Sequence, residues 1–342
     1  MVKLSENILA KLVKLGAIVE PHMEKYLKST CSKEFEEIVL HQIKTGGKRI
    51  RSALVILSSQ AAGGSIEEAI PIAAAIELIH NYSLILDDII DRGELRRGKP
   101  TVWKKYGLSM AILAAVHYRE AIAEAINDSK YALRLHALIA KTNKILAEGE
   151  RLDILFEQFG RLDEPYVVEK RRKAVTLNEY FNMVYAKTGA LIEASCRAGG
   201  IVADADDSII EALGVYGRNI GVAFQIADDI IDIFGEEKKM GKTKGKDIIE
   251  HKMGNIVILL AFEELSENQK EYLSSLLRKE SITKEELMQA IEIISNTSAR
   301  DRAYKIGEKY LNEALECLKK LPDNDAHSDL EELAKFILYR MF

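Results

Sequence analysis

The sequence of 342 residues predicts an all-α fold. Apolar residues recur at helical spacing along almost the whole chain. No stretch alternates polar and apolar residues between hairpin signals, as a half-buried strand would. Only five prolines and 7% aromatic residues stand among abundant Ala, Leu, Ile, Glu and Lys, a composition typical of long helices. We therefore expect one large all-α domain over residues 1–342.

The expected helices follow one another with short breaks that contain glycine, proline or charged residues. None of these breaks is long or biased enough to be an interdomain linker, and no repeat of fixed period occurs. The apolar periodic segments lie at residues 7–27, 33–44, 53–62, 66–91, 108–127, 130–160, 177–200, 207–234, 254–264, 268–279, 284–296, 299–320 and 327–341. The breaks lie at 45–47, 63–64, 92–100, 163–165, 199–200 and 235–246.

Charge and cysteine usage exclude several classes of protein. The net charge of −5 gives no reason to expect a nucleic-acid partner. Three cysteines far apart cannot form a disulfide framework, which favours a reducing compartment. The N-terminal segment mixes apolar and charged residues at helical spacing and resembles no signal peptide. No uncharged run approaches the roughly 18 residues that span a bilayer. We expect a cytoplasmic protein without a transmembrane segment.

The pentapeptide DDIID occurs twice, at residues 87–91 and 228–232, late in two long apolar helices. Residues four apart lie one turn apart on the same helix face, so Asp87 and Asp91 point the same way. Asp88 lies about 100° around the helix from Asp87. The second copy repeats this arrangement.

Carboxylates inside apolar segments are unfavourable unless a cation compensates them. Like charges at this spacing destabilise a helix by a few tenths of a kcal/mol, and desolvation costs more. The ligands are hard carboxylate oxygens without His or Cys, which suits Mg²⁺ or Mn²⁺ rather than zinc. Mg²⁺ characteristically combines one or two carboxylates with water and substrate phosphates. An exposed acidic helix end is the plain alternative for one copy, but two copies in apolar context favour a metal site.

Basic loops follow both acidic motifs. The segment RGELRRGKP (92–100) holds Arg96 and Arg97, whose planar guanidinium groups suit bidentate phosphate binding. Lysine-rich IFGEEKKMGKTKGKD (233–247) follows the second motif, and GGKRIR (46–51) precedes the first. The segment GEEKKMGKT is not a phosphate-binding loop of the Walker type, because five residues separate its glycines and a helix precedes it. Acids on helices with cations on loops indicate a site for diphosphates and bridging metals.

Together these motifs make the chain resemble the trans-isoprenyl diphosphate synthases, the polyprenyl synthetase family, and most of all the archaeal type of geranylgeranyl diphosphate synthase. The signatures stand in family order: GGKRIR (46–51), ELIHNYSLILDDIIDRGELRRGKPTVW (77–103), YFNMVYAKTGAL (180–191), GVAFQIADDIIDIFG (221–235) and GKTKGKD (241–247). The resemblance implies an isoprenoid-synthase-type bundle of about a dozen helices around a deep central cavity, usually as a homodimer.

The resemblance also implies a role for each matching residue. Asp87 and Asp91 would hold two Mg²⁺ ions, and Asp228, with Asp232 nearby, a third. The residues expected to contact the allylic diphosphate are Arg96, Lys187, Thr188, Gln225, Lys242 and Lys252. Those expected to bind the diphosphate of isopentenyl diphosphate are Lys48, Arg51, His80 and Arg97. Asp87, Asp88, Asp91, Asp228, Lys187 and Lys242 form the expected catalytic set.

One of these assignments has support from helical geometry alone. His80 would ordinarily be a core histidine, but it lies seven residues, or two turns, before Asp87 and so on nearly the same face.

The implied reaction needs no nucleophilic side chain. Diphosphate leaves the allylic carbon, the double bond of isopentenyl diphosphate attacks the resulting cation, and loss of a proton leaves a chain five carbons longer. Preorganised positive charge would stabilise the departing diphosphate. Water must be kept out, because it would quench the cation. The loop at 235–246 is a candidate lid.

Product length depends on the residues just before the first motif. In the family a bulky residue four or five places before the first aspartate limits the chain, and here Tyr82 and Ser83 stand there. This pattern resembles that of archaeal geranylgeranyl synthases, so we expect a C20 product, with C15 and C25 as alternatives. By helical wheel Ser83, rather than Tyr82, lies on the Asp87 face.

The chain departs from the family pattern at four positions. His117 and Tyr118 stand where a Gly-Asp pair is frequent; we expect them to pack or pair away from the cavity, with a place at its deep end as the alternative. Ser52 replaces a usual proline, and Glu150 a common glutamine. None of the four is an expected metal or diphosphate ligand.

Two other functions remain as alternatives. A class I terpene cyclase would share the fold and one acidic motif but needs no second diphosphate pocket. A non-catalytic synthase-like subunit would usually have lost an aspartate or the paired arginines, and both are intact here.

Overall fold

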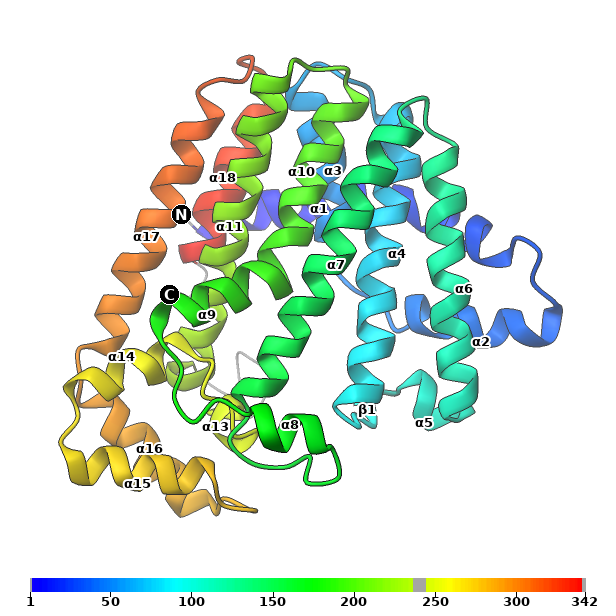
Figure 1. Cartoon of the computed structure of the whole chain (residues 1–342). Coiled ribbons are helices and arrows are strands. Elements are labelled where there is room, and N and C mark those ends of the chain that lie inside the picture. Colours follow the sequence, from blue (N-terminus) through cyan, green and yellow to red (C-terminus); the bar gives the residue numbers. More distant parts are fainter. Residues whose placement is uncertain (1, 236–243, 340–342) are drawn as a thin grey trace. The chain divides into compact units, whose positions relative to one another are not determined.

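Helices make up most of the computed structural model, which describes residues 2–235 and 244–339 (Figure 1). The all-α prediction is confirmed. The helices pack into two compact units, each with its own interior. The first comprises residues 1–141, 191–217 and 317–333, and the second 142–190, 218–316 and 334–342, within the described parts. The single domain expected from the sequence stays a prediction.

The first unit contains the N-terminal helices and a short hairpin. Its elements are α1 (Val2–Lys28), α2 (Lys33–Lys44), α3 (Ile50–Ala61), α4 (Ile66–Ile90), β1 (Leu95–Arg96), β2 (Lys99–Pro100), α5 (Val102–Tyr106) and α6 (Leu108–Asn127). Five helices begin in one unit and end in the other: α7 (Ala132–Phe156), α10 (Ala190–Val202), α11 (Asp207–Phe234), α17 (Ala299–Leu318) and α18 (Asp325–Tyr339).

α4 is the central helix of the first unit and carries the first acidic motif. Ser65 caps its start by accepting a hydrogen bond from the backbone of Glu68. Its alanines and isoleucines are buried against α1, α3 and α6. Among the described helices it alone is long and apolar enough to cross a membrane, but 61% of the apolar window is buried inside the protein. Such burial is typical of a core helix.

The second unit contains the remaining helices and one π-helical turn. These are α8 (Pro165–Lys170), α9 (Leu177–Val184), η1 (Tyr185–Gly189), α13 (Lys246–Ile249), α14 (Ile256–Glu264), α15 (Glu267–Leu277) and α16 (Lys284–Ser295). Capping boxes start three of them, at Thr176 with Glu179, Ser266 with Gln269, and Thr283 with Glu286. The first six residues of α14, Ile256 to Ala261, are all apolar and buried in the core of this unit.

The expected helices agree with the observed ones except in five places. The break expected at 199–200 is wrong: α10 continues through both glycines to Val202, and a Cβ on Gly199 would lie 2.5 Å from the carbonyl oxygen of Val55, so glycine serves close packing here. Residues 157–160 leave the helical path, so α7 ends at Phe156. The segment expected to be one helix at 177–200 is interrupted by η1. Two-residue strands pair in the break at 92–100, with Arg96 opposite Lys99. The short helices α5, α8 and α13 were not expected, because five residues or so carry too little periodicity to be recognised.

Candidate active site

The first acidic motif closes α4. Asp87 lies in the last turn of α4 and is half-buried. Asp91 is the C-cap of the helix and is exposed. Asp88 is buried and accepts hydrogen bonds from Nε of Arg96 at 2.9 and 3.0 Å, while Nη2 of Arg96 lies 2.7 Å from Oδ1. Burial raises the pKa of Asp88, although Arg96 partly offsets this. Asp88 therefore positions Arg96, and the two outer aspartates remain the expected metal ligands.

A hairpin presents Arg96 and Arg97. Arg97 and Gly98 form its two-residue turn with φ of 53° and 75°. A primed turn of this kind needs positive φ at both residues, which is strained for arginine. The start of the hairpin is held by the carbonyl of Gly93, which accepts hydrogen bonds from Thr101 Oγ1 and Trp103 Nε1, both at 2.8 Å.

His80 lies among arginines from two segments of the first unit, the start of α3 and the hairpin. Burial, and then the charges of Arg51, Arg97, Arg96 and Arg49, hold the pKa of His80 well below its usual value. The structure thus brings together three of the four residues expected to bind one diphosphate: Arg51, His80 and Arg97. The fourth, Lys48, is exposed.

A buried glutamate that sequence analysis missed balances this arginine cluster. Glu77 lies 3.5 Å from Nη1 of Arg49 and accepts a hydrogen bond from the backbone N–H of Ser52 at 3.4 Å. Arg49 also pairs with Glu20 and donates to the carbonyl of Ile43. A proline in place of Ser52 would lack the N–H. In the sequence, Glu77 is marked only by being a single acidic residue between the apolar residues of 71–79.

The chain-length candidates lie between His80 and the acidic motif on α4. Tyr82 and Ser83 are both half-buried, and Ser83 donates to the carbonyl of His80 at 3.0 Å. His117 contacts the carbonyl of Leu27 at 2.8 Å, and buried Tyr118 donates to that of Val39 at 2.7 Å. Both side chains therefore pair within the helix packing, as expected.

The second acidic motif lies on α11, in the second unit. Asp229 is buried and accepts hydrogen bonds from three groups: Tyr180 Oη at 2.8 Å, Gln225 Nε2 at 2.9 Å and the backbone of Ile256 at 3.0 Å. Thr188 donates to Gln225 at 3.3 Å. The middle aspartate of this copy is thus also a buried hydrogen-bond acceptor, and it orients Gln225.

Asp228 and Asp232 are the half-buried outer residues of this motif. Asp232 accepts backbone hydrogen bonds from Lys246 at 3.0 Å and Asp247 at 3.2 Å. Burial and the neighbouring Asp247 raise the pKa of Asp232 to about 7. A cation would relieve this repulsion. The hard oxygen donors fit Mg²⁺ held by carboxylates and substrate oxygens; among the described residues, no three acidic, His or Cys side chains already form a cluster.

The ammonium groups of two lysines lie close to the carboxylate of one aspartate of α7, Asp153. Nζ of Lys187 lies 2.5 Å from Oδ2 of Asp153 and 2.8 Å from Oε2 of Glu150. Nζ of Lys252 lies 3.6 Å from the same Asp153 oxygen and 3.4 Å from Glu250. Burial opposes the charge of Lys187, but Asp153 and Glu150 outweigh it and raise its pKa. Lys242 lies outside the described residues.

Local backbone geometry positions both lysines. Lys187 sits in the π-turn η1, and π-turns are frequent at functional sites. A Cβ on Gly149 of α7 would lie 2.4 Å from the backbone nitrogen of Lys187, so only glycine permits this approach. Lys252 forms an isolated antiparallel bridge with Glu157. Sequence analysis missed Asp153 and Gly149, although Glu150 and Asp153 are spaced to share a helix face.

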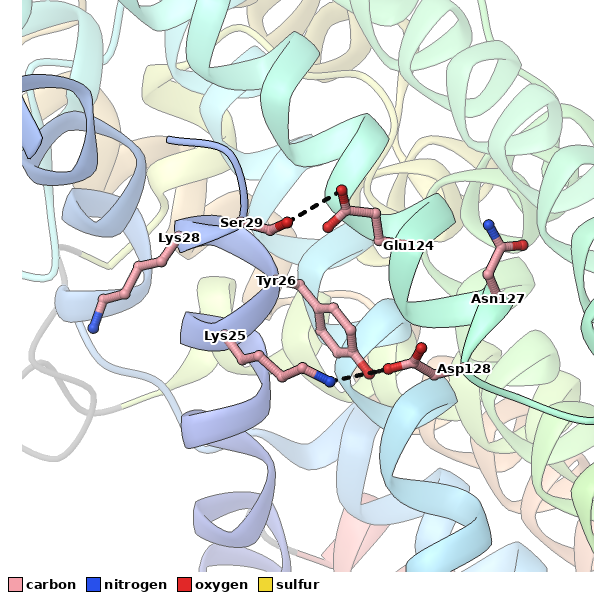
Figure 2. A pocket seen from close by; sticks show the side chains of 7 residues that line it. All are labelled: Lys25, Tyr26, Lys28, Ser29, Glu124, Asn127 and Asp128. Carbon is pink, nitrogen blue, oxygen red and sulfur yellow. Dashed lines mark hydrogen bonds and ion pairs between the residues drawn. The ribbon is translucent and has the colours of Figure 1, made fainter. Parts of the chain in front are cut away.

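A separate hollow of about 590 Å³ lies between α1 and α6 (Figure 2). Tyr26 Oη and Lys25 Nζ both donate to Asp128, at 2.7 and 3.1 Å, and Ser29 approaches Glu124. None of the residues predicted for catalysis or binding lines this hollow. Lys25 pairs with Asp128 within the hollow and Lys28 with Glu24 beside it, so the lysines of this hollow already have carboxylate partners.

The family model for polyprenyl synthetase matches residues 32–294. The chain belongs to the polyprenyl synthetase family. It is accordingly a trans-prenyltransferase, and its family acts on isoprenyl diphosphates and in general uses Mg²⁺.

Named relatives support this membership over nearly the whole chain. The geranylgeranyl diphosphate synthase of Saccharolobus solfataricus is 36% identical over 326 residues, 93% of either chain. A short chain isoprenyl diphosphate synthase of Methanothermobacter thermautotrophicus is 40% identical over 88% of each. The crystal structure of geranylgeranyl pyrophosphate synthetase from Pyrococcus horikoshii superposes with a TM-score of 0.88 at 36% identity, covering 98% of this chain and 99% of that one. The isoprenoid synthase fold expected from the sequence is confirmed.

Proposed function

We propose that this polyprenyl synthetase condenses isopentenyl diphosphate with an allylic diphosphate and makes geranylgeranyl diphosphate (C20). The observation that carries the proposal is that each packing unit has its own set of cationic side chains among the residues predicted to bind diphosphate. One surrounds His80 in the first unit and the other joins Lys187 and Lys252 in the second. A synthase binds two diphosphates, whereas a terpene cyclase needs only one such pocket.

The allylic diphosphate is assigned to the residues that accompany the acidic motifs. Its proposed protein contacts are Arg96, Lys187, Thr188, Gln225, Lys242 and Lys252. Asp87, Asp91, Asp228 and Asp232 would hold three Mg²⁺ ions, with Mn²⁺ as a substitute, and the bound metal would neutralise charge on the leaving diphosphate. Lys48, Arg51, His80 and Arg97 are assigned to isopentenyl diphosphate.

The protein's own groups then account for the chemistry. Lysine ammonium and arginine guanidinium groups bind the departing diphosphate and stabilise its growing charge as the allylic C–O bond breaks. The arginines around His80 hold isopentenyl diphosphate so that its double bond forms the new C–C bond. The proton lost from the isopentenyl unit passes to the released diphosphate. Since His80 is neutral, it contributes a hydrogen bond rather than a charge.

The C20 assignment rests on Tyr82 and Ser83 and on the names of the relatives. Three of the most similar ones are called geranylgeranyl diphosphate synthase. Another, at 36% identity, is the geranylfarnesyl diphosphate synthase of Aeropyrum pernix, which keeps C25 as an alternative.

We further propose a homodimer in the cytoplasm. The support for self-association is an exposed apolar stripe on α6, made of Leu108, Ile112, Leu113 and Val116, each about half exposed. The first, second and fourth lie four residues apart and so share one helix face.

Product analysis tests the proposal. Purified protein is incubated with Mg²⁺, labelled isopentenyl diphosphate and each of the C5, C10 and C15 allylic diphosphates. The expected product is C20, and it disappears with EDTA or in Asp87→Ala. A longer product from Tyr82→Ala would support Tyr82 as the limiting residue. A C15 or C25 product from the wild type would refute the length assignment, and no extension of any primer would refute the synthase.

A further inference from the structure

Glu150 lies on α7 beside the ammonium group of Lys187, and its carboxylate is only half satisfied. Oε2 pairs with Nζ of Lys187 at 2.8 Å. Oε1 is buried and has no hydrogen-bond partner among the described residues. A buried carboxylate oxygen without a partner is unfavourable for folding, so the stability of the fold does not explain it.

The charges around Lys187 are unusual for a group expected to bind an anion. Two ammonium groups, those of Lys187 and Lys252, face three carboxylates, those of Glu150, Asp153 and Glu250. Glu250 also pairs with Nζ of Lys246 at 2.8 Å, so these three ammonium groups and three carboxylates together carry no excess positive charge. Asp153 serves both lysines through the same oxygen, whereas Glu150 contacts Lys187.

We propose that Glu150 is a positioning residue that directs the Lys187 ammonium and weakens its hold on diphosphate. This rests on the proposed function, in which Lys187 contacts the allylic diphosphate. An ammonium has three protons. Two of these protons face the carboxylates of Asp153 and Glu150. The third N–H is thereby directed at a phosphate oxygen of the substrate. The negative charge of Glu150 at the same time opposes the incoming anion, so Glu150 lowers affinity for the allylic diphosphate and promotes release of inorganic diphosphate.

Glu150→Gln tests this inference, because glutamine keeps the shape and one acceptor but removes the charge. We expect inorganic diphosphate with Mg²⁺ to bind about three- to tenfold more tightly by calorimetry, as removal of one nearby charge predicts. KM for the allylic substrate should fall by a similar factor while kcat does not rise. Glu148→Gln is the matched control: it removes a carboxylate from the same helix that pairs with exposed Arg151.

Thermal unfolding separates this role from a structural one. Glu150→Gln should keep the melting temperature of the wild type, because Asp153 still pairs with the Lys187 ammonium in the variant. Diphosphate affinity and KM within twofold of the wild type, or weaker binding, would overturn the inference. So would a large loss of stability, which would make Glu150 a structural ion-pair partner. If the wild type extends no primer, the proposed function fails, whereas the calorimetric comparison still reports on Glu150.

Discussion

At the level of single residues, the three aspartates of each DDIID motif have different tasks. The middle ones, Asp88 and Asp229, are buried hydrogen-bond acceptors that orient Arg96 and Gln225. Helical spacing predicted which aspartates share a face, because that depends only on the turn of the helix. It could not predict the partners of the middle ones, since Tyr180 and Ile256 come from distant segments.

His80 predicts a specific loss of stability in acid. Its folded-state pKa lies below the usual 6.5, so the neutral form is favoured in the folded protein. Its contribution is complete above pH 6.5 and is lost as the pH falls toward the folded pKa, by at most about 1.4 kcal/mol per pH unit. We expect the free energy of unfolding in urea to fall less between pH 7 and pH 5.5 in His80→Gln than in the wild type.

The matched control is His136→Gln, since His136 contacts Asn127 near the surface. That variant should keep the wild-type pH dependence. An equal loss of stability in acid for the wild type and His80→Gln would contradict the assignment.

At the level of elements, long helices were predictable and short departures from them were not. The period of 3.6 repeats several times in α4 or α11, so the signal accumulates. The π-turn η1 depends instead on the close approach of Gly149 from another helix. The hairpin at Leu95–Pro100 has strands of two residues, too short for alternation to appear.

Gly149→Ala should displace the π-turn. A Cβ at this position meets backbone atoms of Ala186 and Lys187 at 2.4 to 2.8 Å, and backbone cannot rotate away. Overpacking of this kind costs about 1–3 kcal/mol. We expect a lower free energy of unfolding and a rise in KM for the allylic diphosphate. Ala147→Leu, at an exposed position of α7, should change neither quantity, and a Gly149→Ala enzyme with wild-type KM would contradict the role of η1.

The apolar stripe on α6 gives a prediction about assembly. Val116→Glu places a charge on a face that the proposed homodimer buries, so the variant should be monomeric by light scattering after size-exclusion chromatography. Its helix content should be unchanged, because Val116 is 55% exposed in the single chain. Arg119→Glu, also exposed on α6, is the control. A dimeric Val116→Glu protein, or a monomeric wild type, would exclude this face as the interface.

At the level of the whole molecule, the first and second acidic motifs belong to different packing units. The family could be identified from the sequence, because each of its motifs is a short continuous segment and the motifs follow one another in the family's order. The buried carboxylates that pair with the cationic residues of each unit could not be predicted. Glu77 and Asp153 act through contacts with residues distant in sequence.

Ligand binding should raise the free energy of unfolding of the protein. At one hundred times its dissociation constant, a ligand raises the free energy of unfolding by about 2.7 kcal/mol. We expect Mg²⁺ and inorganic diphosphate together to raise the melting temperature more than the sum of their separate effects. Differential scanning calorimetry measures this. Asp87→Ala and Asp228→Ala should each abolish the excess, and its persistence in either variant would argue against metal binding at that motif.

Amine-directed acylating reagents react only with neutral lysine. Because Asp153 and Glu150 keep the Lys187 ammonium protonated and its pKa raised, Lys187 should be acylated slowly at pH 8, whereas exposed Lys48 reacts early. Peptide mass spectrometry of partly labelled protein would therefore give each lysine its own rate. Those rates would serve as built-in reporters of which diphosphate position a substrate or inhibitor occupies, without any attached dye.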